Sequence, residues 1–203
     1  MRVTLAGPVG GLEAVIEEPQ PDPQRFAVIC HPHPLFGGTM DNKVVWTIAR
    51  ALEELGVGTL RFNFRGVGAS AGSYEEGIGE TEDAAAALAY GAEHWPRARP
   101  IIAGFSFGAY VAIRLALRSP PSHLITIAPP VGRFPIAELE VPACPWLIVQ
   151  GDADDVVDPR AVLEWARGLV PEPQLVVLPG VGHFFHGALA RLREALQGAV
   201  RSG

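Results

Sequence analysis

The chain has 203 residues, of which 48% are hydrophobic and 19% charged, and its formal net charge is −6. This length fits one folded unit, so we expect residues 1–203 to form a single domain. The acidic balance and the absence of a basic run argue against nucleic-acid binding. No apolar run reaches the ~18 residues of a membrane helix, and residues 1–12 lack the apolar core of a signal peptide. We therefore expect a cytoplasmic protein without membrane contacts.

Apolar strands and amphipathic helices alternate along the chain. One N-terminal strand is expected before the proline-rich stretch 19–23, followed by a buried strand at residues 26–30. The later elements expected are a helix at 41–55, a strand at 58–64, a helix at 81–93, a strand at 100–104, a helix at 107–118, a strand at 123–128, a short helix at 134–139, a strand at 146–150, a helix at 159–170, a strand at 175–178 and a helix at 186–200. This alternation predicts an α/β fold with a mainly parallel sheet and helices on both faces.

Chemically active residues in such a sheet are expected beyond the carboxyl ends of its strands. The run Gly104-Phe105-Ser106-Phe107-Gly108 stands there, because it follows an apolar strand and opens a helix. It fits G-x-S-x-G, in which a serine sits on a sharp strand-to-helix turn with its hydroxyl exposed. Ser106 is the predicted nucleophile, and the alternative is a plain helix-capping serine.

A serine hydroxyl needs a base to act as a nucleophile. After an elbow of this kind the acid and then the histidine follow in chain order. His183 lies between the last expected strand and the last expected helix, where that base belongs. The other interpretation of His183 is a loop histidine that caps the final helix. The acid belongs in the loop after the strand at 146–150, and Asp154 is preferred there with Asp155 as the alternative.

Three blocks resemble the α/β-hydrolase superfamily. GDADDVVDP at 151–159 is similar to the family's G-x-x-D-x-V-V-x-P, which implies that Asp154 is the acid, and RFNFRGVGAS at 61–70 is similar to a second family block. HPHPLFGGTMDNK at 31–43 is similar to a small lidless subgroup related to dienelactone-hydrolase-like and short-chain esterase proteins. The resemblance runs from residue 26 to the C-terminus and implies the α/β-hydrolase fold.

The family pattern also implies an oxyanion hole of two backbone N–H groups. One belongs to Phe107, the residue after the nucleophile, and the other to the HPHPL loop. Pro32 and Pro34 have no N–H, which leaves His33 or Leu35. We favour Leu35 at this point.

Other chemistries fit the sequence less well. The histidine pairs 31/33 and 183/186 lack the Cys or Glu partners that would complete a zinc site, so we expect no metal and no cofactor. The GVGASA run at 66–71 is followed by more loop and not by a helix, which excludes a dinucleotide-binding fingerprint.

The predicted function is a serine hydrolase that cleaves a small ester, thioester or lactone through a Ser106-Asp154-His183 triad. Residues 129–145 are too few and too rich in proline for a cap domain, so the site should be open and shallow. The alternatives are an idle ligand-binding module on the same fold, or a small-peptide or acyl-transfer enzyme on the same triad. The partner expected is a small acyl substrate, and the sequence leaves the oligomeric state open, a homodimer included.

Overall fold

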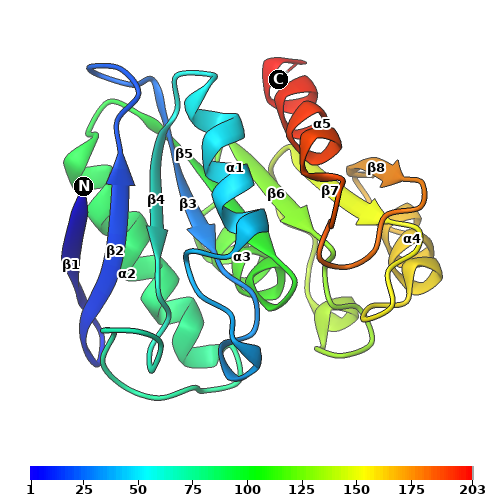
Figure 1. The fold of residues 1–203 in the computed structure, drawn as a ribbon, viewed down its shortest axis with the longest axis horizontal. Helices are drawn as coiled ribbons and strands as arrows, with labels where there is room; N and C mark the ends of the chain where they lie inside the picture. Colours follow the sequence, from blue (N-terminus) through cyan, green and yellow to red (C-terminus); the bar gives the residue numbers. More distant parts are fainter. Residues whose placement is uncertain (203) are drawn as a thin grey trace.

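An eight-stranded sheet with helices on both faces makes up the computed structural model, which describes residues 1–202 (Figure 1). The strands are β1 (Arg2–Gly7), β2 (Gly10–Glu17), β3 (Arg25–Cys30), β4 (Gly58–Phe62), β5 (Arg99–Phe105), β6 (His123–Ile127), β7 (Trp146–Gly151) and β8 (Gln174–Leu178). The α-helices are α1 (Lys43–Glu53), α2 (Ile78–His94), α3 (Phe107–Arg118), α4 (Pro159–Arg167) and α5 (Leu189–Ser202). Two single 3-10 turns, η1 (Pro34–Phe36) and η2 (Ile136–Glu138), lie in loops.

The strand order is β1-β2-β4-β3-β5-β6-β7-β8, and β3 to β8 run parallel. The mainly parallel α/β fold expected from the alternating pattern is therefore confirmed. Only the N-terminal edge is antiparallel, where β1 pairs with β2 and β2 pairs with β4. The sequence pattern predicts one strand there; the chain instead forms a hairpin that turns between Gly7 and Gly10, the last pair of its register.

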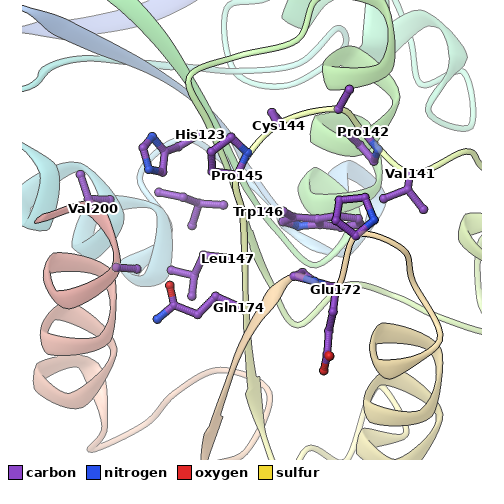
Figure 2. A pocket seen from close by; sticks show the side chains of 15 residues that line it. His123, Val141, Pro142, Cys144, Pro145, Trp146, Leu147, Glu172, Gln174 and Val200 are labelled. Carbon is purple, nitrogen blue, oxygen red and sulfur yellow. The ribbon is translucent and has the colours of Figure 1, made fainter. Parts of the chain in front are cut away.

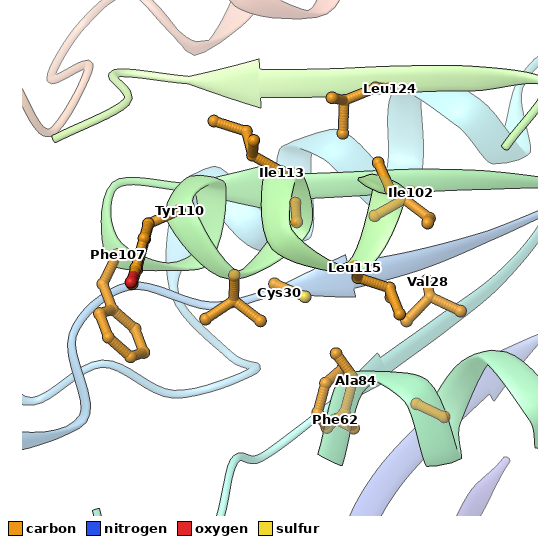
Figure 3. Packing of buried hydrophobic residues seen from close by; sticks show 14 of the residues in the cluster. Val28, Cys30, Phe62, Ala84, Ile102, Phe107, Tyr110, Ile113, Leu115 and Leu124 are labelled. Atoms are coloured by element: carbon orange, nitrogen blue, oxygen red, sulfur yellow. The ribbon is translucent and has the colours of Figure 1, made fainter. Parts of the chain in front are cut away.

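Two apolar layers hold the helices to the sheet. Helices α1 and α5 lie together on one face, in front of the sheet in Figure 1, and α2, α3 and α4 cover the other. Figure 3 shows Leu115 of α3 beside Val28 of β3 in the cluster that joins this helix to the sheet. These side chains are almost completely buried, so α3 cannot shift without opening the core. This fixes the place of its first residue, Phe107.

Element boundaries differ from the expected ones where a side chain or a turn takes over a backbone group. Strand β4 ends at Phe62 and not at residue 64, because the N–H of Phe64 donates to Nε2 of His31 (3.0 Å). Helix α5 begins at Leu189 and not at residue 186. Phe185 has φ 54° and Gly187 has φ 70°, which are left-handed values that a right-handed helix excludes.

Three other helices are shorter than expected. Helix α1 covers Lys43–Glu53 and not 41–55, because Asn42 is its N-cap. Helix α4 ends at Arg167, with Gly168 as its C-cap, three residues before the predicted end. The helix expected at 134–139 is the single turn η2. The segment between β6 and β7 thus carries no cap domain, as the sequence predicted.

A buried ion pair fixes the long loop between β4 and α2. The guanidinium of Arg65 binds both carboxylate oxygens of Asp83, and neither side chain is exposed by more than 3%. Arg65 also pairs with Glu75, and both carboxylate oxygens of Glu80 accept backbone N–H groups, from Glu75 and Gly77. A buried charge pair of this geometry is costly to break, because it leaves an uncompensated charge. The loop therefore has one position over the carboxyl ends of the strands.

Candidate active site

Ser106 stands on a strained turn between β5 and α3. Its φ of 54° and ψ of −120° are unusual for a residue with a side chain, and such a conformation costs of order 1–3 kcal/mol. Glycine is required on both sides of the turn. A Cβ at residue 104 would lie 2.0 Å from the carbonyl oxygen of Gly108, and one at residue 108 would lie 2.3 Å from that of Cys30. The turn is the elbow that the G-x-S-x-G pattern predicted.

His183 reaches Ser106 from the loop between β8 and α5. Its Nε2 lies 3.1 Å from Oγ of Ser106, and its Nδ1 lies 2.8 Å from Oδ2 of Asp154. The imidazole is buried and packs against the rings of Phe105 and Phe184, at 5.2 and 5.1 Å between centroids. These contacts hold the ring in the orientation that joins the serine to the carboxylate.

Asp154 is bound through both of its oxygens. Oδ1 accepts the N–H groups of Val156 (2.9 Å) and Val157 (2.8 Å), while Oδ2 accepts from His183 and from Nε2 of Gln150 (3.1 Å). Burial raises the pKa of this carboxyl, but the hydrogen bonds from His183 and the two amides outweigh it, so the pKa is lowered. An ionised Asp154 keeps a hydrogen on Nδ1 of His183 and leaves Nε2 free to accept the serine proton.

The other aspartates of the same loop make different contacts. Asp155 is exposed, whereas the carboxylate that binds His183 is that of Asp154. Asp158 caps α4 by accepting the N–H of Arg160, and Asp152 accepts the N–H of Gly180. Of the two aspartates that sequence position left open, Asp154 is the one that contacts His183.

Gln150 is a site residue that the sequence analysis missed. It is fully buried at the end of β7 and donates to the same oxygen of Asp154 that binds His183. A polar residue closing an otherwise apolar strand was the signal that could have identified it.

His31 has a structural place beside the site. It is fully buried, its Nδ1 lies 2.6 Å from the carbonyl oxygen of Pro32, and its Nε2 accepts from Phe64. Burial lowers the pKa of His31 to about 4, although the bond to Pro32 opposes this. The neutral ring therefore ties the loop after β3 to the end of β4.

Three backbone N–H groups are the candidates for an oxyanion hole, those of Phe107, His33 and Leu35. Phe107 is the first residue of α3, so its N–H has no acceptor within the helix. The N–H of Leu35, the residue favoured above, donates to Nδ1 of His33 (3.2 Å), and its side chain is 67% exposed. The N–H of His33 has no acceptor among the described residues. The N–H of Leu35, the favoured candidate, is therefore taken up by a hydrogen bond, and that of the alternative, His33, remains available.

Gly38 and Gly108 show how closely this loop meets the elbow. A Cβ at residue 38 would lie 2.0 Å from the carbonyl oxygen of Pro32, and one at residue 108 would lie 2.5 Å from that of His31. The HPHPL loop is thus pressed between its own continuation and the start of α3. The rings of His33 and Phe107 lie 5.0 Å apart in consequence.

A separate hollow of about 530 Å³ lies at the opposite end of the strands from Ser106. Figure 2 shows its lining around His123, Cys144 and Trp146, at the amino ends of β6 and β7, with Gln174 at the start of β8. This lining is largely apolar. The hollow contains no member of the triad, because Ser106, Asp154 and His183 all follow the carboxyl ends of their strands.

Between residues 1 and 202, no three His, Cys, Asp or Glu side chains are grouped so that they could hold a metal ion. Among the described helices, none has the length and apolar character needed to cross a membrane.

Comparison with known proteins places this architecture. The structure is similar to an α/β serine hydrolase without a lid from Xanthomonas campestris, with a TM-score of 0.95 and 47% identity, covering 100% of this chain and 94% of that one. A homologue of α/β serine hydrolases from Coxiella burnetii gives a TM-score of 0.94 at 47% identity over 98% of this chain and 96% of that one. An uncharacterized protein from Rickettsia prowazekii is 36% identical over 96% of this chain and 86% of its own length.

No model of a known protein family matches the sequence. The fold and the relatives nevertheless define the class. The chain belongs to the α/β-hydrolase superfamily, in its group of small lidless members.

Proposed function

We propose that the protein is a serine hydrolase that cleaves small ester, thioester or lactone bonds through an acyl-enzyme on Ser106. The observation that carries this proposal is the continuous chain of contacts from Asp154 through His183 to a serine on a strained elbow. An idle ligand-binding module would have no use for that strain or for a buried, fully bonded carboxylate behind the histidine.

The first half of the reaction acylates the serine. Oγ of Ser106 attacks the carbonyl carbon while Nε2 of His183 takes its proton. The negative charge that develops on the carbonyl oxygen is held by the N–H groups of Phe107 and His33, each contributing ~3–4 kcal/mol. When the tetrahedral intermediate collapses, the bond to the leaving oxygen breaks and that oxygen receives the proton from Nε2.

The second half returns the enzyme. Nε2 of His183 removes a proton from water, the hydroxide attacks the acyl carbon, and the proton passes back to Oγ as the acid leaves. Asp154 stabilises the imidazolium that forms in both halves and remains ionised throughout, which its lowered pKa favours.

The rim of the site favours small acyl groups or acyl groups carried on an exposed surface. Phe36 is 84% exposed and Phe184 is 50% exposed, and they stand on the loops that bring His33 and His183 to the elbow. The only regular structure between β6 and β7 is the turn η2. Two exposed rings beside an uncovered serine offer apolar contact without a deep tunnel for a long lipid chain.

A chain-length series of p-nitrophenyl esters tests the substrate class, and a fluorophosphonate probe tests the nucleophile. We expect turnover to be highest with short acyl chains, and labelling of the wild type but not of Ser106→Ala. Equal and weak turnover at every length would favour another acyl class, and labelling that survives the substitution would overturn the assignment of Ser106.

A further inference from the structure

The side chain of His33 is used in a way that the triad does not explain. Its backbone N–H is the one donor of the stretch 32–34, since both flanking residues are proline. Its carbonyl oxygen is fixed by the N–H groups of Phe36 (3.1 Å) and Gly38 (3.0 Å). Its Nδ1 accepts the N–H of Leu35, so the residue caps its own 3-10 turn. The N–H of His33 is thus left unused, while its carbonyl oxygen and Nδ1 are both bonded within the turn.

The second ring nitrogen reaches another loop. Nε2 of His33 lies 3.1 Å from Oη of Tyr74. Because Nδ1 accepts a backbone hydrogen, the hydrogen of the neutral ring is on Nε2 and is donated to the tyrosine oxygen. Burial lowers the pKa of His33, which favours this neutral state near pH 7.

Tyr74 is a firm anchor because its loop is itself clamped. Its neighbour Glu75 pairs with the buried Arg65, and the N–H of Glu75 donates to Glu80 (2.8 Å). The ring of Tyr74 lies 5.8 Å from that of Phe107. The Arg65–Asp83 pair therefore fixes the loop from which Tyr74 contacts His33.

The imidazole also joins the two amides proposed for the oxyanion hole. It packs on the ring of Phe107 at 5.0 Å between centroids, and Phe107 in turn packs on Phe134 at 5.3 Å. In Figure 3, Phe107 lies at the end of α3, which the helix core holds in place. One side chain thus contacts both the turn that carries one donor and the residue that carries the other.

We infer that His33 is a positioning residue, whose imidazole, held by Tyr74 and Phe107, aims its own backbone N–H into the oxyanion hole. This inference rests on the proposed serine-hydrolase function. A positioning role can be told from a merely structural one by kinetics. The N–H of His33 would bind charge that exists only in the transition state, so misalignment of this N–H lowers kcat and leaves KM nearly unchanged.

Three variants separate the contacts, with p-nitrophenyl acetate as substrate. His33→Ala keeps the N–H but loses both ring contacts, and we expect kcat to fall about ten- to hundredfold with KM within about twofold. His33→Asn restores an acceptor for Leu35, because the Asn Oδ1 occupies the place of Nδ1, and should recover about tenfold of the loss. Tyr74→Phe removes one oxygen atom and should lower kcat about three- to tenfold.

The matched controls are His123→Ala, at the amino end of β6, and Tyr90→Phe, on α2. Both residues are half-buried. Both should leave kcat within about twofold of the wild type. Thermal unfolding midpoints of all five variants show which remain folded, and if His33→Ala does not fold, Tyr74→Phe decides.

The outcomes distinguish this inference from the function on which it rests. Wild-type turnover with Ser106 labelling, but unchanged kcat in His33→Ala and Tyr74→Phe, overturns the inference alone. So does a loss in His33→Ala that His33→Asn fails to recover and Tyr74→Phe does not share. Absence of both turnover and labelling in the wild type overturns the proposed function itself.

Discussion

The two halves of the candidate site are built on opposite principles. In the triad half, Ser106, Asp154 and His183 present side-chain atoms, and each is oriented by backbone amides or by packing. In the proposed oxyanion half, the donors are the backbone N–H groups of Phe107 and His33, and the imidazole of His33 packs on the ring of Phe107 and accepts the N–H of Leu35. In the triad half, backbone amides and packed side chains together orient reacting side chains, whereas in the proposed oxyanion half a side chain is set beside backbone donors.

The halves also differ in how they can fail. A triad member can be deleted by a single substitution, because its reacting atom is part of the side chain. A backbone N–H is removed only by substitution to proline. Other substitutions can weaken the oxyanion half only by misaligning its N–H groups. We therefore expect large losses from the triad half and graded losses from the oxyanion half.

The largest effect should come from Ser106→Ala or His183→Ala. Either change removes a group on which the other depends, and in comparable triads the loss in kcat is of order 10⁵–10⁶. Steady-state kinetics on p-nitrophenyl acetate measure it. Ser119→Ala, at the exposed far end of α3, is the matched control and should keep wild-type kcat. Retention of more than about a hundredth of the activity in Ser106→Ala would mean that the triad half does not carry the chemistry.

Asp154→Asn should follow, with a loss in kcat of about 10⁴. The amide would turn an N–H group toward Nδ1 of His183 or toward Val156 and Val157, so that the tautomer that leaves Nε2 free is lost. Asp155→Asn is the control, since that side chain is exposed, and should change kcat by less than about twofold. The reverse result would move the acid by one residue.

These triad residues are the part of the site that could be predicted from the sequence. Ser106 follows an apolar strand and precedes a helix, and His183 follows the last strand, so their chain positions imply their places in a parallel sheet. Asp154 and Asp155 could not be separated by position, because the choice depends on which carboxylate the 151–159 loop turns inward. The turn depends on hydrogen bonds from the N–H groups of Val156 and Val157 to Asp154, which no local sequence pattern predicts.

The oxyanion half was less predictable for a physical reason. A proline excludes its own N–H from any role, and this was visible in the sequence. Whether a remaining N–H is free depends on the position of a neighbouring lone pair, and Nδ1 of His33 takes up the N–H of Leu35. Tyr74 was equally hidden, since its contact with His33 spans 41 residues and needs the buried Arg65–Asp83 pair to hold its loop.

The sharpest test of the oxyanion half is His33→Pro measured against His33→Ala. The φ of His33 is −54°, a value that proline adopts, so the turn can accept the change. Both variants lose the imidazole, but only the proline variant loses the N–H. We expect kcat of His33→Pro to lie a further ~10²-fold below that of His33→Ala, in the range found for a deleted oxyanion donor. Equal kcat in the two variants would exclude the N–H of His33 as a donor.

Acid should lower the stability of the folded chain through His31, which ties the loop after β3 to the end of β4. Its pKa is lowered to about 4 from the ordinary 6.5, so between these values the unfolded chain binds a proton that the folded chain does not. Stability is therefore full above pH 6.5 and falls toward pH 4, by roughly 3 kcal/mol for this group. Urea unfolding at a series of pH values measures the fall.

His31→Gln isolates that contribution. The variant keeps an acceptor near Phe64 but cannot titrate, so its stability should depend less on pH in this window, even if it is lower at pH 7. The pKa values of His33 and His123 are also lowered by burial and add slope of the same sign to both proteins. The difference between the two slopes is thus the quantity to compare, and equal slopes would remove His31 as the cause.

Ser106 itself offers the most direct measurement. The wild type, mixed with a p-nitrophenyl ester and quenched in acid within the first turnover, should carry one acyl group per chain on the peptide that contains Ser106, and the amount should match the burst of p-nitrophenol. Ser106→Ala should show neither the adduct nor the burst. Steady turnover with no acyl group on that peptide, or with the group on another residue, would contradict the assignment of Ser106 as the nucleophile.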